Sequence, residues 1–91
     1  MKEVTFKDPG LFQNDVIPIL NEDLDQLYKW GFQSVSPFEW LTYLTEEVGE
    51  LAAAISEFIY RDGDPEKISK EAIQVATLAL KISKMAKGIR E

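Results

Sequence analysis

Residues 36–65, which decide the fold, read SPFEWLTYLTEEVGELAAAISEFIYRDGDP. The segment Ser36-Pro37-Phe38-Glu39 is typical of a helix start, because the serine can cap the helix and proline is tolerated at the first helical position. The apolar residues that follow recur at spacings of three and four and form one seam: Leu41, Leu44, Val48, Leu51, Ile55 and Phe58. This seam predicts a long amphipathic helix, which Arg61-Asp62-Gly63 ends.

A second long helix is predicted from Asp64-Pro65 onward, because an aspartate cap followed by proline again favours a helix start. Its apolar seam consists of Ile68, Ala72, Val75, Ala79, Ile82, Ala86 and Ile89. The short link between the two helices predicts an antiparallel hairpin over about residues 37–87.

A shorter helix is predicted upstream of this hairpin. Its apolar residues recur at spacings of three and four: Ile17, Leu20, Leu24 and Leu27. Asn14 or Asp15 can cap it, Pro18 falls in its first turn, and Gly31 is a plausible stop. Residues 1–13 contain the turn signal Asp8-Pro9-Gly10 and are predicted to form an irregular arm.

The length of the chain, 91 residues, predicts a single domain over residues 1–91. Its hydrophobic fraction of 45% is sufficient for folding, but a lone domain of this size buries a limited share of its surface. Long apolar helices would therefore gain from packing against another copy. We predict an all-α domain of three helices that completes a four-helix-type bundle by homo-oligomerisation, as a dimer or a tetramer.

The charge and the residue usage narrow the possible functions. A net charge of −6 speaks against binding of a nucleic-acid polymer, which needs a basic surface. The chain has no cysteine and no histidine, so its chemistry must come from carboxylates, hydroxyls, amides and lysines, which suit hard cations such as Mg²⁺ or Mn²⁺. No signal peptide and no membrane-spanning run is recognisable, so no membrane contact and a cytoplasmic location are expected.

Acidic side chains gather at the predicted contact between the two long helices. With about 100° per residue, Glu47 lies at the edge of its seam, Glu50 lies further round, and Glu46 lies nearly opposite the seam. Glu71 lies at the edge of the other seam, with Gln74 beyond it. Because the helices are antiparallel, Glu47, Glu50, Glu71 and Gln74 are predicted to form one patch. A divalent ion would offset the repulsion among its carboxylates.

Two simpler interpretations of these acids stay open. Glutamates are good helix formers, and most helical clusters of glutamate are solvated faces. Lys67, Lys70 and Lys81 lie towards the same side, so Glu47 and Glu50 can also form ordinary ion pairs between helices.

The pattern resembles that of the MazG-like nucleoside triphosphate pyrophosphohydrolases and the related dimeric dUTPases. These families carry Glu-x-x-Glu on one helix and Glu-x-x-Asp on the next. Residues 44–51, LTEEVGEL, are similar to the first motif, and residues 71–74, EAIQ, stand where the second would be. The resemblance covers roughly residues 38–87, and the second motif departs from the family at Gln74, where the family has aspartate.

The resemblance implies an enzyme that uses Mg²⁺ to split a nucleoside triphosphate into a monophosphate and pyrophosphate. Carried over, Glu47, Glu50 and Glu71 become metal ligands, and Gln74 offers an uncharged carbonyl in place of a carboxylate. Glu46 becomes an outer ligand or the base that orients the attacking water, so Glu46 and Glu47 are the expected catalytic residues. Metal ions are suited to this reaction because they neutralise developing charge and lower the pKa of bound water.

Lysines and aromatic residues provide candidates for contacts with the substrate. Lys70, Lys81 and Lys84 can bind phosphate or can be ordinary surface lysines. An aromatic group near the start of the first long helix can stack on a nucleobase, or fill the core or a subunit contact: Trp30, Phe32, Phe38, Trp40 and Tyr43.

The sequence is therefore compatible with three hypotheses. The first is a Mg²⁺-dependent nucleotide pyrophosphohydrolase. The second, favoured by Gln74, is a divergent or inactive relative that binds a nucleotide or a protein. The third is a structural oligomerisation domain whose acids have no role in chemistry.

Overall fold

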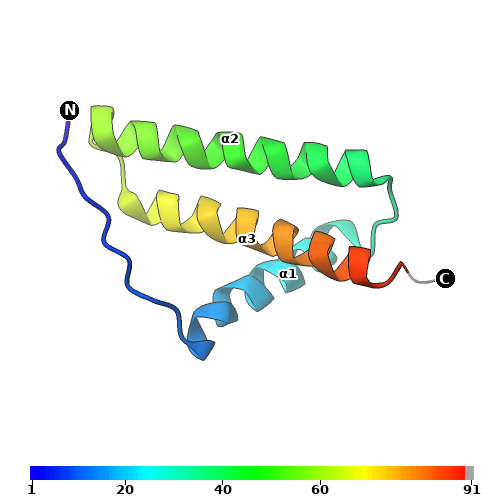
Figure 1. Ribbon diagram of the computed structural model, residues 1–91. Helices are drawn as coiled ribbons and strands as arrows, with labels where there is room; N and C mark the ends of the chain where they lie inside the picture. The colour runs from blue at the N-terminus through cyan, green and yellow to red at the C-terminus, as the bar shows by residue number, and fades with distance from the viewer. Residues whose placement is uncertain (90–91) are drawn as a thin grey trace.

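A computed structural model describes residues 1–89, and within this range every regular element is a helix (Figure 1). The elements are the 3-10 helix η1 (Gln13–Val16) and the α-helices α1 (Ile17–Trp30), α2 (Pro37–Arg61) and α3 (Pro65–Lys87). The prediction of an all-α chain is therefore confirmed for this range. None of these helices combines the length and the apolar character needed to cross a membrane.

The two long helices begin where their caps were predicted. Ser36 Oγ accepts a hydrogen bond from the backbone N–H of Glu39 at 3.2 Å, and α2 starts at Pro37. Asp64 Oδ1 accepts from the backbone N–H of Glu66 at 3.0 Å, and α3 starts at the following proline. Each cap satisfies a backbone donor that the helix leaves without a partner.

The link between α2 and α3 reverses the chain within three residues, 62–64. Asp62 takes a left-handed conformation with φ of 59°, and the backbone N–H of Gly63 donates to Glu57 O at 3.0 Å. A Cβ atom on Gly63 would lie 3.1 Å from the carbonyl carbon of Glu57, which is too close for an ordinary contact. A side chain at position 63 would have to displace the backbone of Glu57 by a few tenths of an ångström, so glycine favours the link that lays α3 antiparallel against α2 (Figure 1).

The shorter helix α1 packs against α3 and makes no comparable contact with α2. The contact between α1 and α3 is partly polar: Lys81 Nζ lies 2.9 Å from Asp23 Oδ1 and donates to Gln26 Oε1 at 3.2 Å. The cap of α1 was predicted wrongly, because Val16 occupies that position after the 3-10 helix. Pro18 lies in the first turn, and Gly31 follows the last residue, as predicted.

The N-terminal arm is attached to the hairpin near the link between α2 and α3. The backbone N–H of Lys2 donates to Ile59 O at 2.9 Å, its Nζ lies 2.6 Å from Asp62 Oδ1, and the same ammonium lies 4.2 Å from the centre of the Phe58 ring. From this anchor the arm runs outside the helices to η1 (Figure 1).

The buried interior of the described chain is small and lies mainly between α2 and α3. Its apolar members are Trp40, Ala54, Ile68 and Leu78, and its polar members are Glu71 and Thr77. Thr77 satisfies its hydroxyl by donating to Ile73 O at 2.7 Å. Glu71 is the one ionisable side chain in this interior, and it leads directly to the candidate site.

Candidate metal centre and adjoining cleft

Three carboxylates meet between the middle of α2 and the N-terminal third of α3. Glu47 and Glu50 come from α2, Glu71 comes from α3, and one oxygen of each lies within 4.8 Å of the others. The sequence predicted that these three side chains would lie together, and the structure brings them together. Two oxygens on opposite sides of one Mg²⁺ are about 4.2 Å apart, given metal–oxygen bonds of about 2.1 Å. The upper limit of 4.8 Å on the separations within the cluster is close to that spacing.

Glu71 is the most buried member of this acidic cluster, with 6% of its surface exposed. Burial raises the pKa of its carboxyl group, as do the charge of Glu50 and a hydrogen bond with it, whereas Lys67 and Lys70 lower the pKa. Within residues 1–89 the ion pairs join Lys2 to Asp62 and Lys81 to Asp23, so neither reaches the cluster. Glu71 is thus a buried acid that lies beside another acid and forms no ion pair within the described residues.

The electrostatic environment of Glu47 is similar. Burial raises the pKa of the Glu47 carboxyl group, and the charges of Glu50 and Glu71 raise it further, followed by those of Glu22 and Glu46. Acids that disfavour one another's ionised form are stabilised by a divalent cation. The donor set consists of carboxylate oxygens only, and this is the chemistry that Mg²⁺ and Mn²⁺ prefer.

Gln74 lies directly beside two of these acids. With its amide nitrogen facing the cluster, Nε2 donates to Glu47 Oε2 at 2.8 Å and to Glu71 Oε2 at 3.0 Å. This orientation suits the cluster without a cation, because ionised carboxylate oxygens only accept hydrogen bonds, whereas the opposite orientation presents the amide oxygen to the cluster. Gln74 therefore lies at the cluster, as the sequence predicted, and in the cation-free chain it serves as a hydrogen-bond donor.

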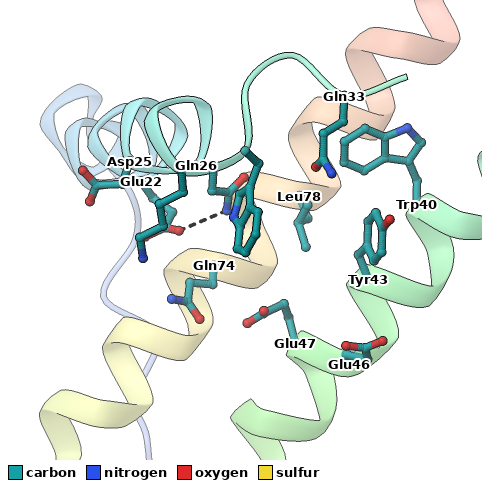
Figure 2. Close-up of a pocket in the computed structure, with 12 residues that line it drawn as sticks. Glu22, Asp25, Gln26, Gln33, Trp40, Tyr43, Glu46, Glu47, Gln74 and Leu78 are labelled. Atoms are coloured by element: carbon teal, nitrogen blue, oxygen red, sulfur yellow. Dashed lines mark hydrogen bonds between the residues drawn. The ribbon is translucent and has the colours of Figure 1, made fainter. Parts of the chain in front are cut away.

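A cleft of about 480 Å³ opens next to the cluster and shares Glu47 and Gln74 with it (Figure 2). The cleft is bordered by all three α-helices and is of a size typical of small-molecule sites. Its other lining residues are Glu22, Asp25, Gln26, Lys29, Trp30, Gln33, Trp40, Tyr43, Glu46 and Leu78. A ligand in this cleft would lie beside the acidic cluster, with Glu47 at the boundary.

The predicted aromatic group divides between this cleft and the open surface. Trp40 is buried and packs edge-on against Tyr43, with ring centres 5.6 Å apart. Trp30 also lines the cleft but is 66% exposed, so its ring is available to a ligand. Phe32 and Phe38 lie largely in solvent and outside this cleft.

The remaining predicted site residues lie in different surroundings. Glu46 is exposed and lines the cleft next to Glu47 (Figure 2). Lys81 is bound to α1 through Asp23 and Gln26, whereas Lys70 and Lys84 are exposed on α3. None of the three lysines lines the cleft, and their contact with phosphate stays a prediction.

Sequence reasoning missed the contribution of α1 to the cleft. Glu22, Asp25, Gln26 and Lys29 all line it, and Gln26 Nε2 donates to Glu22 Oε2 at 3.0 Å. Their spacings of three, one and three form a polar stripe along one side of the helix. That stripe is visible in the sequence, but the surface that it faces depends on contacts between α1 and α3 that are distant in the chain.

Comparison with known protein families, curated proteins and solved structures finds no match to this chain. The interpretation of the site therefore rests on its own geometry and chemistry.

Proposed function

We propose that this protein is a Mg²⁺- or Mn²⁺-dependent nucleoside triphosphate pyrophosphohydrolase, similar in its chemistry to the MazG-like enzymes. The observation that carries the proposal is the buried Glu71 carboxylate, which meets Glu47 and Glu50 within 4.8 Å and has no cationic side chain in ion-pair contact within residues 1–89. A buried carboxylate is costly unless a positive charge offsets it. A bound divalent cation would supply that charge.

In this proposal the role of each residue follows from its position in the cluster or the cleft. A bound cation supplies charge neutralisation at the phosphates and a more acidic water. Glu47, Glu50 and Glu71 hold the cation, and Glu47 also faces the cleft. Glu46 lines the same cleft and is exposed, so its carboxylate can accept a proton from a water near the phosphates.

The adjoining cleft is the proposed site of the base and sugar. Trp30 supplies an accessible ring for stacking, and the amide groups of Gln26 and Gln33 offer both hydrogen-bond donors and acceptors. Four acids and one lysine line the cleft, so a bare triphosphate would be repelled. We therefore expect the nucleotide to bind together with its divalent cation.

The proposal includes assembly of the chain into a homo-oligomer. The accessible surface is 7545 Å², whereas about 5,400 Å² is expected for a compact monomer of this mass. The Cα radius of gyration is 15.1 Å, compared with about 12 Å for a compact domain of this length. Exposed apolar residues on two helices support the same conclusion: Ile17, Leu20 and Leu24 on α1, and Leu41, Val48 and Ile55 on α2.

The direct test is an assay of pyrophosphate release by the purified chain. Mg²⁺ or Mn²⁺ is supplied with a panel of common and modified nucleoside triphosphates, and the product is identified as a monophosphate plus pyrophosphate. We expect release with at least one nucleotide and its loss in Glu71→Gln. Glu57→Gln is the matched control, because Glu57 is an exposed acid of α2 outside the cluster. The absence of release across the whole panel would contradict the proposal.

A second candidate function is binding of a nucleotide without turnover. It is favoured by Gln74, whose two hydrogen bonds to Glu47 and Glu71 partly satisfy the cluster without any cation. This candidate predicts that a nucleotide–Mg²⁺ complex binds and quenches tryptophan fluorescence while no pyrophosphate appears. The assay and a fluorescence titration together separate the two candidates.

A further inference from the structure

Helix α2 packs against a single neighbouring helix. Among the helices within residues 1–89 it contacts α3 alone, and Figure 1 shows α2 at one edge of the molecule. On its uncovered side Leu41, Val48 and Ile55 keep 52%, 46% and 37% of their surface exposed. With about 100° per residue, these three side chains lie within about 40° of one another around the helix. Apolar residues aligned over about four turns are typical of a face that another helix covers.

Small side chains lie beside these three apolar residues. Thr45 and Ala52 are exposed and point to the same side of α2. The Thr45 hydroxyl donates to Leu41 O at 2.8 Å, so burial of this threonine would leave no hydroxyl proton without an acceptor. We call the row Leu41, Thr45, Val48, Ala52 and Ile55 the outer seam. A second helix can approach the outer seam closely, because its side chains are apolar or small.

The charged residues of α2 all lie away from the outer seam. Around the helix they are at least about 80° from Leu41, Val48 and Ile55: Glu39, Glu46, Glu47, Glu50, Glu57 and Arg61. The exposed face of a helix normally carries charged side chains, and the chain has a net charge of −6. Copies of so acidic a chain repel each other where their acids meet, so an uncharged face is the one suited to contact between copies.

The spacing of the outer seam makes it complementary to a second copy of itself. Leu41 and Ile55 each lie seven residues from Val48, which is about 10.5 Å along the helix. A two-fold axis at Val48 therefore lays Leu41 of each copy against Ile55 of the other, with the two Val48 side chains between these contacts. The two helices run antiparallel in this arrangement, which places opposite ends of their dipoles side by side.

The accessible surface of the chain is large enough to supply such a contact. Its area of 7545 Å² exceeds the area of about 5,400 Å² expected for a compact monomer by roughly 2,100 Å². Each partner in an interface of standard size buries about 800 Å². The excess area is therefore more than a stable dimer requires.

We propose that two copies of this chain form an antiparallel dimer in which the outer seam of α2 packs against itself around a two-fold axis at Val48. The inference deepens the assembly that the proposed function includes, and it rests on the proposed function in that respect only. Glu46 and Glu47 line the cleft and point away from the outer seam. Each copy therefore keeps an accessible cleft in this dimer.

The first test exchanges charges across the contact between Leu41 and Ile55. Leu41→Glu and Ile55→Lys would each place two charges in a dimer of identical chains, and we expect either variant alone to sediment as a monomer. An equal mixture of the two variants allows one contact between opposite charges and keeps one apolar contact. We therefore expect the mixture to sediment as a dimer of the 10.4 kDa chain.

The matched control is an equal mixture of Leu41→Glu and Leu41→Lys. In an antiparallel dimer the two substituted positions lie about 21 Å apart along α2, so this mixture should stay monomeric. A dimer in the control mixture would indicate parallel helices, and a monomer in the first mixture would exclude the contact between Leu41 and Ile55. Either result would overturn the proposal.

The second test is disulfide cross-linking, which is selective because the chain contains no cysteine of its own. Under mild oxidation we expect Val48→Cys to form a linked dimer, since position 48 of both copies lies at the axis. Leu41→Cys and Ile55→Cys should each run as a monomer on a non-reducing gel and should cross-link when they are mixed before oxidation. Ala53→Cys, exposed on α2 outside the outer seam, is the control and should stay unlinked. A linked dimer of Leu41→Cys alone, or none of Val48→Cys, would contradict the arrangement.

The results separate failure of this inference from failure of the proposed function. A Val48→Cys dimer, together with an unmodified protein that releases no pyrophosphate, would support the contact and contradict the enzyme. Pyrophosphate release by a dimer that does not cross-link through position 48 would exclude the contact and leave the enzyme unaffected. An unmodified protein that sediments as a monomer would overturn the inference together with the assembly in the proposed function.

Discussion

The carboxylate of Glu71 lies in the interior of the α2–α3 hairpin, beside those of Glu47 and Glu50. A neutral side chain of the same shape would fold more favourably at this position, because burial disfavours an ionised group. Functional sites commonly keep residues that reduce stability. The proposed cation would offset the unfavourable free energy of burying this charge.

Replacement of Glu71 by glutamine tests how much the buried carboxylate reduces the stability of the folded chain. In the absence of divalent cations, we expect Glu71→Gln to raise the melting temperature at neutral pH, because it removes a buried charge and its repulsion with Glu50. In the presence of Mn²⁺, we expect the unmodified protein to gain stability and Glu71→Gln to gain none. Thermal denaturation with and without Mn²⁺ measures both effects. A lower melting temperature for cation-free Glu71→Gln would contradict the argument.

The same acids predict how stability depends on pH. The pKa values of Glu47 and Glu71 are raised in the folded chain above their ordinary value of 4.5, so the folded state binds protons more tightly than the unfolded state. The stability that these protons contribute is complete below pH 4.5 and is lost as the pH rises through the folded pKa values. We expect the cation-free protein to become more stable as the pH falls from neutral towards that value.

The control for this pH series is a second acid with the opposite behaviour. A hydrogen bond and the charge of Lys2 lower the pKa of Asp62 from its ordinary value of 3.8. The contribution of Asp62 to stability is therefore lost only as the pH falls below 3.8, whereas Glu47 and Glu71 act above pH 4.5. Urea denaturation at a series of pH values should show a reduced pH dependence above pH 4.5 in Glu47→Gln and an unchanged one in Asp62→Asn.

At the scale of the elements, local signals predicted the long helices better than the short one. The starts of α2 and α3 depend on Ser36 and Asp64, whose hydrogen bonds lie within the next few residues. Such contacts are readable from sequence because they need no distant partner. The position of Gly31 after α1 is a local signal of the same kind.

The orientation of α1 could not be read in this way. Its polar stripe faces the cleft, and Lys81 holds it from α3 through Asp23 and Gln26. These partners are separated by 55 residues or more in the chain, so no local pattern specifies the pairing. The acidic cluster was predictable because it needs only two helices of one hairpin, whereas the cleft needs a third helix whose placement depends on tertiary contacts.

Asp64 offers a test of the hairpin that leaves the site intact. Asp64→Ala removes the acceptor for the Glu66 backbone N–H at the start of α3. We expect a loss of about 1 kcal/mol in the free energy of unfolding, equivalent to a melting temperature lower by roughly 4–8 °C. Mn²⁺ binding should be unchanged below the transition, since Asp64 lies outside the cluster. Asp8→Ala in the exposed arm is the control and should leave the melting temperature nearly unaltered.

At the scale of the whole molecule, the described chain has more surface than its interior can stabilise. Four apolar side chains are buried within residues 1–89, which is little for a domain that must offset the conformational entropy lost on folding. Apolar residues of α1 and α2 remain exposed at helical spacing, and so do Val4 and Phe6 of the arm. Burial of these faces against further copies would supply the missing apolar contact.

Disruption of one apolar face should therefore change the assembly and the stability together. Leu41 on α2 is 52% exposed, and Leu41→Glu would place a charge on this face. We expect light scattering to give a dimer or tetramer of the 10.4 kDa chain for the unmodified protein and a smaller species for Leu41→Glu. The smaller species should also melt at a lower temperature, because the contact between copies contributes to stability.

The matched control is Ala53→Glu, because Ala53 is exposed on the same helix but points about 120° away from Leu41. It adds the same charge to α2 and should leave the molecular mass unaltered. A monomeric unmodified protein at micromolar concentration, with a melting transition independent of concentration, would contradict assembly. In that case the exposed faces of α1 and α2 would have to be compatible with a stable monomer, although only four apolar side chains are buried in the described chain.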